Sequence, residues 1–281
     1  MEEFQPISPT KKSEEFRDYA TSARQEKVFA FYQKQHKNQT VEFNRKIREQ
    51  FEGRPKISMG LWEMLRFLDD VEDSSDPDTN LSQMAHALQT AESVRRMFPE
   101  QKYDWFHLVG LIHDLGKVLT VTDEEKGFHA LEQWAVAGDT FPVGCAFDES
   151  CVFHDLFRAN PDFNDDRYSS KLGIYSDHCG LSNVMMSWGH DEYLYQVCVR
   201  NKCSLPRKAL SIIRFHSFYP WHGKGAYKYL TDSSDAEALK WVKKFNEHDL
   251  YSKAHELPDF AILRDYYKTL IEKYFPEKLN W

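Results

Sequence analysis

A histidine and an aspartate stand side by side in the apolar run LVGLIHDLGK, and this pair most constrains how the chain can fold. Burying His113 and Asp114 in a helix is costly unless they are paired or bound to a metal ion. Adjacent helical side chains point about 100° apart, so the imidazole and the carboxylate can converge on one ion. The second carboxylate oxygen can then reach another ion. The pair therefore predicts a metal site on a buried central helix.

Helical periodicity dominates the rest of the chain and predicts an all-α fold. Ser82 is placed to cap a helix whose apolar residues recur in steps of three and four, and Pro99 follows the end of that helix. Patterns typical of strands are sparse. We expect helices at residues 82–98, 104–117, 190–199, 204–216 and 236–250.

Polar, turn-rich stretches connect these segments without marking a domain boundary. Residues 69–80 are acidic, residues 121–133 resemble a charged surface insertion, and residues 138–183 are rich in loop-forming residues. There is no internal repeat and no shift in composition. We therefore expect a single helical catalytic domain over residues 1–281, with residues 1–15 as a flexible N-terminal segment.

Charge and cysteine content disfavour several classes of function. Thirty-six basic against 44 acidic residues give a net charge of −8, which disfavours a broad basic surface for nucleic acid or anionic membrane. No apolar run is long enough to span a bilayer. The 5 cysteines include no CxxC pair and are expected to be reduced thiols. We expect a cytoplasmic protein, and a monomer because no dimerisation motif appears.

Further candidate ligands lie on separate predicted helices. His86 lies in a stretch lined by Ala, Met and Leu, His190 begins a helical segment, and His216 ends an apolar one. Asp249 continues an apolar stripe in steps of four. A lone histidine of this kind is more often a core residue than a ligand. Several of them on separate helices are typical of a metal site between helices.

Two ions can be assigned to these residues. The first ligand set has two imidazoles and two carboxylates, namely His86, His113, Asp114 and Asp249. His190 and His216 suit a second ion if Asp114 bridges the two. Ligation by imidazole and carboxylate without thiolate favours iron, manganese or zinc.

The neighbours of the His–Asp pair have expected roles of their own. Lys117 lies on the same side of the predicted helix as His113 and Asp114, so its cation should face whatever binds the metals. Gly116 can let another backbone or a ligand approach closely. Asp191 is expected to cap a helix, with orientation of His190 as the alternative.

The remaining histidines are given ordinary structural roles. Three lie in charged contexts and are expected at the surface: His36, His129 and His255. His107 is expected in the core. Three more lie in loop-like stretches and are left open: His154, His178 and His222.

The order H…HD…D, carried by His86, His113-Asp114 and Asp249, resembles the HD-domain superfamily of metal-dependent phosphohydrolases. Longer motifs go further: DWFHLVGLIHDLGK, GDTFPVGC, VMMSWGHDEYLYQV and IRFHSFYPWH. These resemble the myo-inositol oxygenase family, and the similarity extends from about Phe16 to Trp281. Only the extreme N-terminus and residues 121–133 look unlike the animal members.

This resemblance implies an HD-domain-like helical bundle that encloses a mixed-valent Fe(II)/Fe(III) pair. The activity it implies is oxidation of myo-inositol to D-glucuronate with dioxygen, by cleavage of a ring carbon–carbon bond in inositol catabolism. Its six metal ligands are then His86, His113, Asp114, His190, His216 and Asp249. Asp114 and Lys117 are the implied catalytic residues. The implied substrate contacts are Arg17, Tyr32, Asp73, Lys117, Asp139, His216, Ser217 and Lys253.

Two other readings start from the same residues. An HD phosphohydrolase would use the first metal site but would leave the longer motifs unexplained. A helical ligand-binding protein with a degenerate site would be missing ligands, yet every ligand position of the pattern is occupied.

Overall fold

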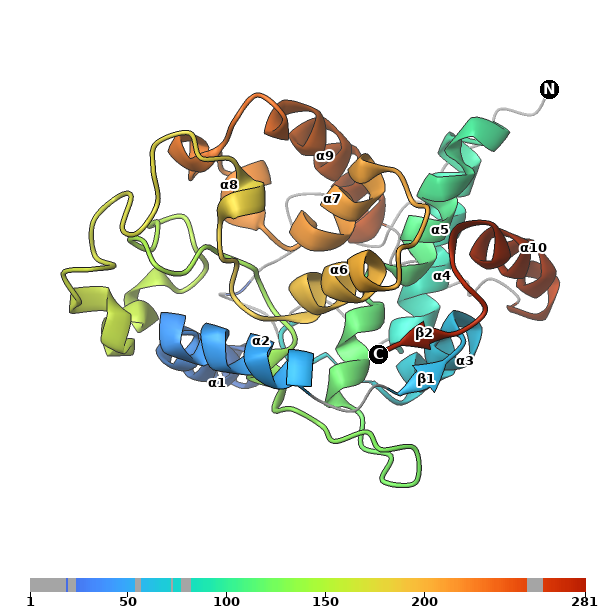
Figure 1. The fold of residues 1–281 in the computed structure, drawn as a ribbon, viewed down its shortest axis with the longest axis horizontal. Coiled ribbons are helices and arrows are strands. Elements are labelled where there is room, and N and C mark those ends of the chain that lie inside the picture. Colours follow the sequence, from blue (N-terminus) through green and yellow to red (C-terminus); the bar gives the residue numbers. More distant parts are fainter. Residues whose placement is uncertain (1–18, 20–23, 54–56, 72, 77–81, 252–259) are drawn as a thin grey trace.

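The computed structural model describes residues 19, 24–53, 57–71, 73–76, 82–251 and 260–281, and these are almost entirely helical or looped (Figure 1). The α-helices are α1 (Gln25–Asn38), α2 (Val41–Gly53), α3 (Leu61–Leu65), α4 (Gln83–Met97), α5 (Asp104–Ile112), α6 (His190–Arg200), α7 (Arg207–Phe215), α8 (Tyr219–His222), α9 (Asp235–Tyr251) and α10 (Phe260–Tyr274). Short 3₁₀ helices are η2 (Arg66–Asp70), η3 (Gln101–Tyr103), η4 (Leu115–Thr120), η5 (Gln133–Ala135), η6 (His154–Ala159), η7 (Pro161–Asn164), η8 (Leu181–Asn183) and η9 (Lys228–Leu230). The prediction of a mostly helical protein is confirmed.

The helices α4 and α5 pack against each other and contribute many residues to the main apolar core. The Ser82 side chain accepts a hydrogen bond from the Ala85 N–H, so the predicted cap of α4 is confirmed. α5 is buried along its whole length, as its apolar sequence predicts. The two helices approach closely at Gly110, where an added Cβ would lie 2.7 Å from the Cα of Ala91. A glycine is therefore required at this crossing.

Helices α6, α7 and α9 complete the layer around α5. α7 contacts α5, α6 and α9, and α9 also contacts α4. Their apolar faces belong to one large buried cluster that includes Leu194, Ile212 and Phe245. The predicted helices 190–199, 204–216 and 236–250 are confirmed to within a few residues. The first residue of α6, the residue after α7 and the last turn of α9 meet in the interior, beside the end of α5.

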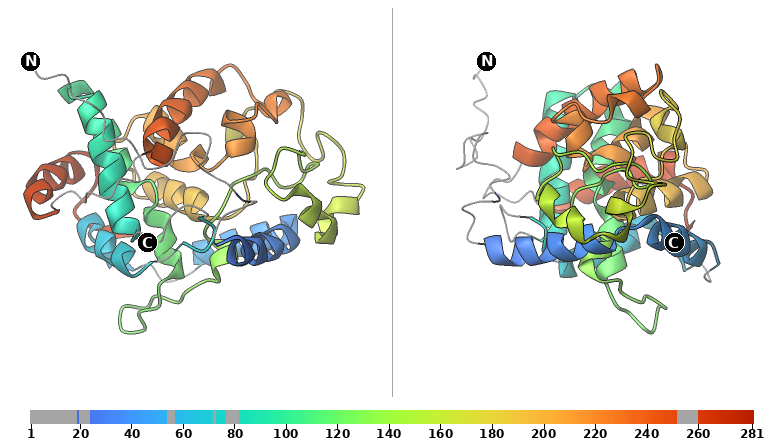
Figure 2. Two further views of the ribbon diagram at one scale, coloured as in Figure 1. Left: turned by 180° about the vertical axis from the view of Figure 1, so that it is seen from behind. Right: turned by 90° about the vertical axis from the view of Figure 1, so that its left-hand side faces the viewer.

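The long segment between η4 and α6 consists of loops and short 3₁₀ turns, as predicted for residues 138–183. Together with α1 and α2 it forms one side of the molecule, seen from two further directions in Figure 2. α1 packs against η5 and η6. This contact brings the buried face of α1 towards the loop that leads into α6.

One pair of strands departs from the all-α prediction. β1 (Ser58–Met59) and β2 (Leu279–Asn280) pair antiparallel, with Met59 opposite Leu279. The Trp281 indole N–H donates to the Met59 carbonyl at 3.0 Å and fixes the end of the chain to β1. Strands of two residues are too short for an alternating pattern, so periodicity cannot detect them.

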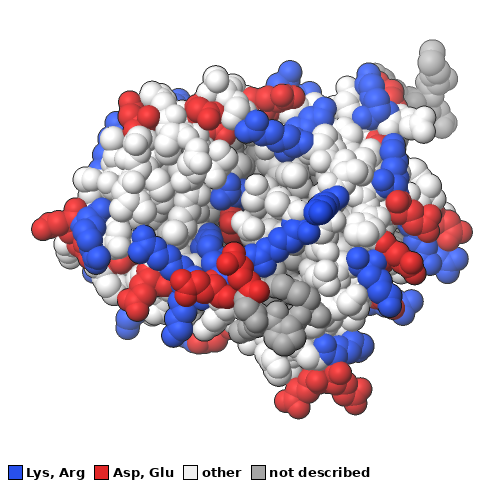
Figure 3. All heavy atoms as spheres, viewed as in Figure 1, with Lys and Arg blue, Asp and Glu red and all other residues white. Residues whose placement is uncertain are grey.

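Charged side chains of both signs are interspersed over the face drawn in Figure 3. Among the described residues, no helix is both long and apolar enough to cross a membrane.

Candidate metal centre

The α5 helix ends at the His–Asp pair instead of running through it. α5 stops at Ile112, and the 3₁₀ helix η4 begins at Leu115. The Lys117 N–H donates to the Asp114 carbonyl at 2.9 Å, which is the i to i+3 bond of a tighter turn. The predicted continuous helix over residues 104–117 is therefore wrong in its last turn. The pair lies where the chain changes its winding.

Gly116 lets this tightened backbone approach another helix closely. A Cβ added to Gly116 would lie 2.1 Å from the carbonyl oxygen of His190. Only a residue without a side chain lets η4 approach the first turn of α6 this closely. The predicted close approach at Gly116 is confirmed, and its partner is the backbone of another candidate ligand.

Two histidines and two aspartates meet between α4, α5 and α9. Asp249 Oδ1 lies 2.9 Å from His86 Nε2 and 3.2 Å from His113 Nε2. Asp114 Oδ2 lies 3.7 Å from His86 Nε2 and 3.5 Å from His113 Nε2. We call His86, His113 and Asp114 the α4–α5 group; their ligand atoms can face a single ion.

The tautomer of His113 supports a cation at this position. Its Nδ1 lies 2.9 Å from the Gly110 carbonyl oxygen, which can only accept, so Nδ1 carries the proton. In the neutral ring, Nε2 then presents a lone pair to the interior. Among the described residues this buried Nε2 has no hydrogen-bond partner, although two carboxylates lie nearby. A metal ion would satisfy both the lone pair and the carboxylates.

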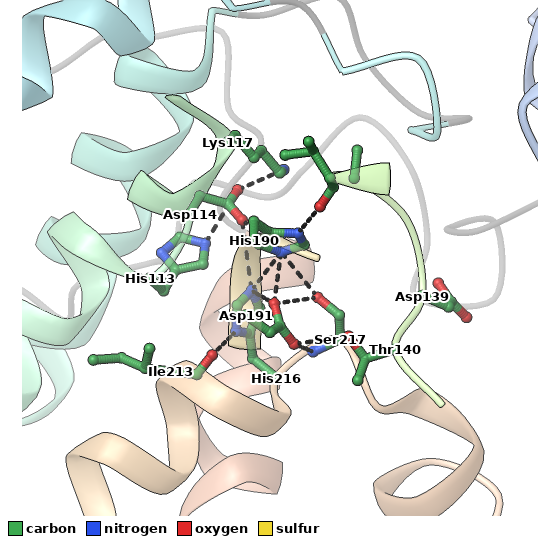
Figure 4. Close-up of polar contacts among 12 residues, drawn as sticks. His113, Asp114, Lys117, Asp139, Thr140, His190, Asp191, Ile213, His216 and Ser217 are labelled. Atoms are coloured by element: carbon green, nitrogen blue, oxygen red, sulfur yellow. Dashed lines mark hydrogen bonds and ion pairs between the residues drawn. The ribbon is translucent and has the colours of Figure 1, made fainter. Parts of the chain in front are cut away.

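A second group lies between α6 and α7 (Figure 4). His190 Nδ1 contacts the Val136 carbonyl at 2.8 Å, and His216 Nδ1 contacts the Ile213 carbonyl at 3.2 Å. By the same reasoning, the Nε2 atoms of the two neutral rings would carry lone pairs, and they lie only 3.3 Å apart. Asp114, His190 and His216, which we call the α6–α7 group, can face a second ion.

Asp114 belongs to both groups, with one oxygen on each side. Oδ2 faces the α4–α5 group, whereas Oδ1 lies 3.3 Å from His190 Nε2 and 3.5 Å from His216 Nε2. The side chain is almost completely buried. Burial opposes its charge, but Lys117 and the surrounding histidines hold the pKa of Asp114 well below its usual value. A shared, ionised carboxylate between two sets of imidazoles is a dinuclear arrangement.

Lys117 supplies the positive charge beside this carboxylate. Its Nζ lies 2.8 Å from Asp114 Oδ2, from Asp73 Oδ2 and from Gln83 Oε1. Burial favours the neutral amine, yet the two carboxylates outweigh it and raise the pKa of Lys117. Burial likewise opposes the charge on Asp73, but Lys117 and Ser75 lower its pKa to about 2. Lys117 and Asp73, two of the predicted substrate contacts, therefore lie together beside the centre as an ion pair.

Asp191 is the residue that sequence reasoning misplaced. It was expected to cap α6, but its side chain makes no capping bond there. It is fully buried and its Oδ1 lies 2.7 Å from His190 Nε2. Its Oδ2 accepts from the Ser217 N–H and the Thr140 hydroxyl, each at 3.2 Å. The sequence feature that indicates a place for Asp191 in the metal centre is its adjacency to His190, a candidate ligand.

The other predicted substrate contacts fall into two sets. Ser217 Oγ lies 3.2 Å from His190 Nε2, beside the α6–α7 group. Asp139 lies apart from the ligands in Figure 4 and accepts a hydrogen bond from the Tyr32 hydroxyl of α1 at 3.1 Å. Arg17 and Lys253 lie outside the described residues.

One histidine expected at the surface is in the core. His36 is fully buried, stacks on Phe157 with ring centroids 3.8 Å apart, and contacts the Val152 carbonyl through Nε2 at 2.7 Å. Burial lowers its pKa to about 4. The aromatic loop residues that cover it are far away in sequence, so its charged neighbours on the chain were misleading.

The remaining histidines mostly behave as expected. His129 is exposed, and His107 is buried, bonded to the Tyr266 hydroxyl at 2.6 Å. His255 lies outside the described residues. Of the three left open, His222 is buried and contacts the His216 carbonyl at 2.8 Å, so it supports the segment that carries His216. The other two contact backbone carbonyls in loops: His154 and His178.

Known proteins resemble this chain over nearly its whole length. The family described as "Myo-inositol oxygenase" matches residues 25–281. The inositol oxygenase of Dictyostelium discoideum is 51% identical over 273 residues, which cover 97% of this chain and 91% of that protein. The inositol oxygenase of Mus musculus is 49% identical over 272 residues, which cover 96% of this chain and 92% of that protein.

A plant relative gives the same result. A probable inositol oxygenase of Oryza sativa subsp. japonica is 51% identical over 267 residues, which cover 95% of this chain and 85% of that protein. The matched residues include α4, α5, α6, α7 and α9, and therefore both His/Asp groups of the centre. With its helical fold and its two groups around one shared aspartate, this chain belongs to the myo-inositol oxygenase family.

Proposed function

We propose that this chain converts myo-inositol and dioxygen to D-glucuronate by opening the inositol ring. The observation that carries the proposal is the shared carboxylate of Asp114, which joins two buried imidazole groups in a chain about half identical to several inositol oxygenases. Two His/Asp groups suit a dinuclear centre. Family membership supports iron as its metal.

The residues fit an iron pair in their donor chemistry. The α4–α5 group together with Asp249 would hold one ion, and the α6–α7 group would hold the other, with Asp114 as the bridge. Imidazole and carboxylate donors without thiolate suit iron. When bound, a mixed-valent Fe(II)/Fe(III) pair supplies Lewis acidity towards hydroxyl groups and redox chemistry with dioxygen.

The two groups offer different numbers of ligand atoms. The α4–α5 group gains a fourth ligand from Asp249, whereas the α6–α7 group has three ligands in our assignment. Fewer protein atoms would therefore hold the ion of the α6–α7 group, which would leave room there for oxygen atoms of the substrate. Ser217 lies beside it and offers a hydroxyl to an inositol oxygen.

Lys117 is proposed to act on charge that develops during the reaction. Inositol is neutral, so a fixed ammonium group contributes little to the ground state and more to an alkoxide formed from a bound hydroxyl. Asp73 and Asp114 keep the lysine protonated and hold its Nζ at the edge of the centre. Lys117 would thus favour the deprotonated hydroxyl without donating its own proton.

Orientation of the ring is proposed to come from the far side of the site. Asp139 can accept hydrogen bonds from ring hydroxyls, and Tyr32 holds its carboxylate through one oxygen. Gln35 donates to the Asp139 carbonyl at 3.3 Å and fixes the same segment. Arg17 and Lys253 are proposed to complete the substrate contacts.

The domain organisation, the oligomeric state and the location of the protein are proposals or predictions as well. We propose one domain, since the main apolar cluster includes residues from Ile47 to Trp281. A monomer and a cytoplasmic location remain predictions from the sequence.

The proposal is tested by following dioxygen uptake and glucuronate formation in iron-loaded protein supplied with myo-inositol. We expect about one dioxygen consumed per glucuronate formed. The control is Asp114→Ala, taken through the same iron loading. If wild-type protein with two irons per chain consumes no dioxygen, the proposal fails. Phosphate release from a nucleotide panel would then favour the phosphohydrolase alternative.

A further inference from the structure

Two cysteines lie close together in the turn between α6 and α7. Neither has a role in the proposed reaction. Cys198 lies in the last turn of α6 and is fully buried. Cys203 follows the end of the helix, is partly exposed, and packs against the same apolar cluster. A buried and an accessible thiol are thus neighbours in a short connection.

The backbone holds these residues at a distance suited to a disulfide. The Cys203 N–H donates to the Cys198 carbonyl at 3.1 Å. With Cα–C, C=O and N–Cα bonds of about 1.5, 1.2 and 1.5 Å, this contact keeps the two Cα atoms within about 7 Å. Disulfides usually join Cα atoms roughly 4.4–6.8 Å apart. Lys202, in a left-handed conformation with φ 53°, closes the turn between them.

The two sulfurs have complementary protonation. The Cys198 thiol donates a hydrogen bond to the Cys203 sulfur, which lowers the pKa of Cys203 to about 7. The Leu205 N–H donates to the same sulfur and acts in the same direction. The bond to Cys203, together with burial, raises the pKa of Cys198 well above its usual value. Cys203 is also the more exposed of the two, so an oxidant reaches its sulfur first and Cys198 is the buried partner.

We propose that Cys198 and Cys203 form a redox modification site, which hydrogen peroxide converts to an intramolecular disulfide. The Cys203 thiolate attacks one peroxide oxygen, the O–O bond breaks, and the departing hydroxide takes up a proton to form water. The Cys198 sulfur then attacks the resulting sulfenic sulfur. Its proton leaves with the hydroxyl as a second water. Two thiols lose two electrons, and one peroxide becomes two waters.

The disulfide would form away from the metal centre but on the helices that carry one of its groups. Cys198 follows His190 on α6 by roughly 12 Å of helix. Cys203 leads into α7, at whose far end His216 lies. Oxidation would therefore cross-link the connection between these two helices without touching a proposed ligand.

The test treats the reduced, metal-loaded full chain with hydrogen peroxide at neutral pH, blocks remaining thiols and maps tryptic peptides without reductant. Trypsin cleaves after Arg200 and Lys202, so the two cysteines fall on separate peptides and a disulfide appears as a linked pair. Cys179 shares the peptide of residues 172–200 with Cys198. Cys179→Ser is therefore the matched control that makes the link unambiguous.

We expect peptides 172–200 and 203–207 to be linked in both the wild-type and Cys179→Ser proteins, and to separate on adding dithiothreitol. Cys203→Ser should form no link. Cys198→Ser should stop at a sulfenic acid on Cys203 that dimedone traps. In untreated protein, iodoacetamide should modify Cys203 faster than Cys179 at neutral pH, because the pKa of Cys203 is lowered and that of Cys179 is raised.

Two results would overturn the proposal. One is peroxide-treated wild-type protein in which Cys203 can still be fully alkylated. The other is a wild-type disulfide that disappears in Cys179→Ser, because the link would then involve Cys179. Both are read without the Cys198→Ser variant, so the test holds even if substitution at that buried position prevents folding.

Discussion

The two groups of the centre share one carboxylate but are built from different surroundings. The α4–α5 group lies among long helices, and Asp249 of α9 faces both of its histidines through one oxygen. The α6–α7 group instead lies beside hydroxyl groups and a loop, and the Val136 carbonyl orients His190. The first group suits firm retention of an ion. The second suits exchange of oxygen ligands, as binding of a polyol requires.

Asp114→Ala should have the largest effect on metal content and activity, because it removes the carboxylate that the two groups share. Each proposed ion loses a ligand, and Lys117 loses one of its two countercharges. We expect both ions to be lost and glucuronate formation to become undetectable. Metal analysis of the purified variant and dioxygen uptake check this. A variant that still binds two ions would show that Asp114 is not the bridge.

Asp249→Ala should remove the ion of one group and leave that of the other. Its carboxylate contacts only the histidines of the α4–α5 group among the described residues, so that ion should be lost while the other stays. His216→Ala is the mirror variant and should lose the other ion. Turnover should vanish in both, and metal-to-protein ratios distinguish them. Loss of both ions from either variant would mean that the groups form one cooperative unit.

Lys117→Ala should keep both ions and lose rate. Removing a positioned charge that acts on a developing oxyanion typically costs roughly 10²–10³ in kcat. Gln83→Ala is the matched control, because it removes one hydrogen bond to Lys117 and leaves the charge. We expect its kcat to change far less. Normal turnover in Lys117→Ala with full metal content would remove the lysine from the mechanism.

Asp191→Asn should weaken the α6–α7 group selectively. The amide keeps an oxygen for the Ser217 and Thr140 donors but loses the negative charge beside His190. Asp191 fixes the Ser217 backbone next to His216, and groups that hold metal ligands in place typically contribute about 10–100-fold to metal affinity or activity. Titration of metal-free protein should show weaker binding of one ion only. Thr140→Val, which removes one donor to Asp191, serves as the milder control.

Tyr32→Phe should have the smallest effect and should spare both groups. It removes the hydroxyl that donates to Asp139, a loss of about 1 kcal/mol or roughly fivefold in KM. Metal content and kcat should be unchanged. A change in metal content instead would mean that α1 supports the centre itself and not the substrate side.

Much of the candidate metal centre could be predicted from the sequence. Periodicity predicts the helices on which, or beside whose ends, the six proposed ligands lie, and all six side chains converge in the structure. The reason is physical: an ionisable residue in an apolar helical stripe must find a partner when it is buried. His86 and Asp249 illustrate this, since they meet at 2.9 Å although the chain between them is long.

Other features depend on contacts between distant segments, which periodicity along the chain does not describe. The partner of Gly116 is the His190 backbone, which comes from a distant part of the chain. The position of Asp191 depends on Thr140 and Ser217, which come from a loop and from the segment after α7. His36 is buried because a remote aromatic ring stacks on it. Periodicity describes which face of a helix is apolar but not what covers it.

The missing side chain at Gly116 has a practical consequence for protein engineering. Because a backbone carbonyl fills the space that a Cβ would need, any substitution there pushes η4 away from His190 and so moves the ligands apart. A mutant library aimed at new substrates should leave this position fixed. Most substitutions at this position would prevent the metal centre from assembling. The resulting inactive variants would give no information about which polyols the protein accepts.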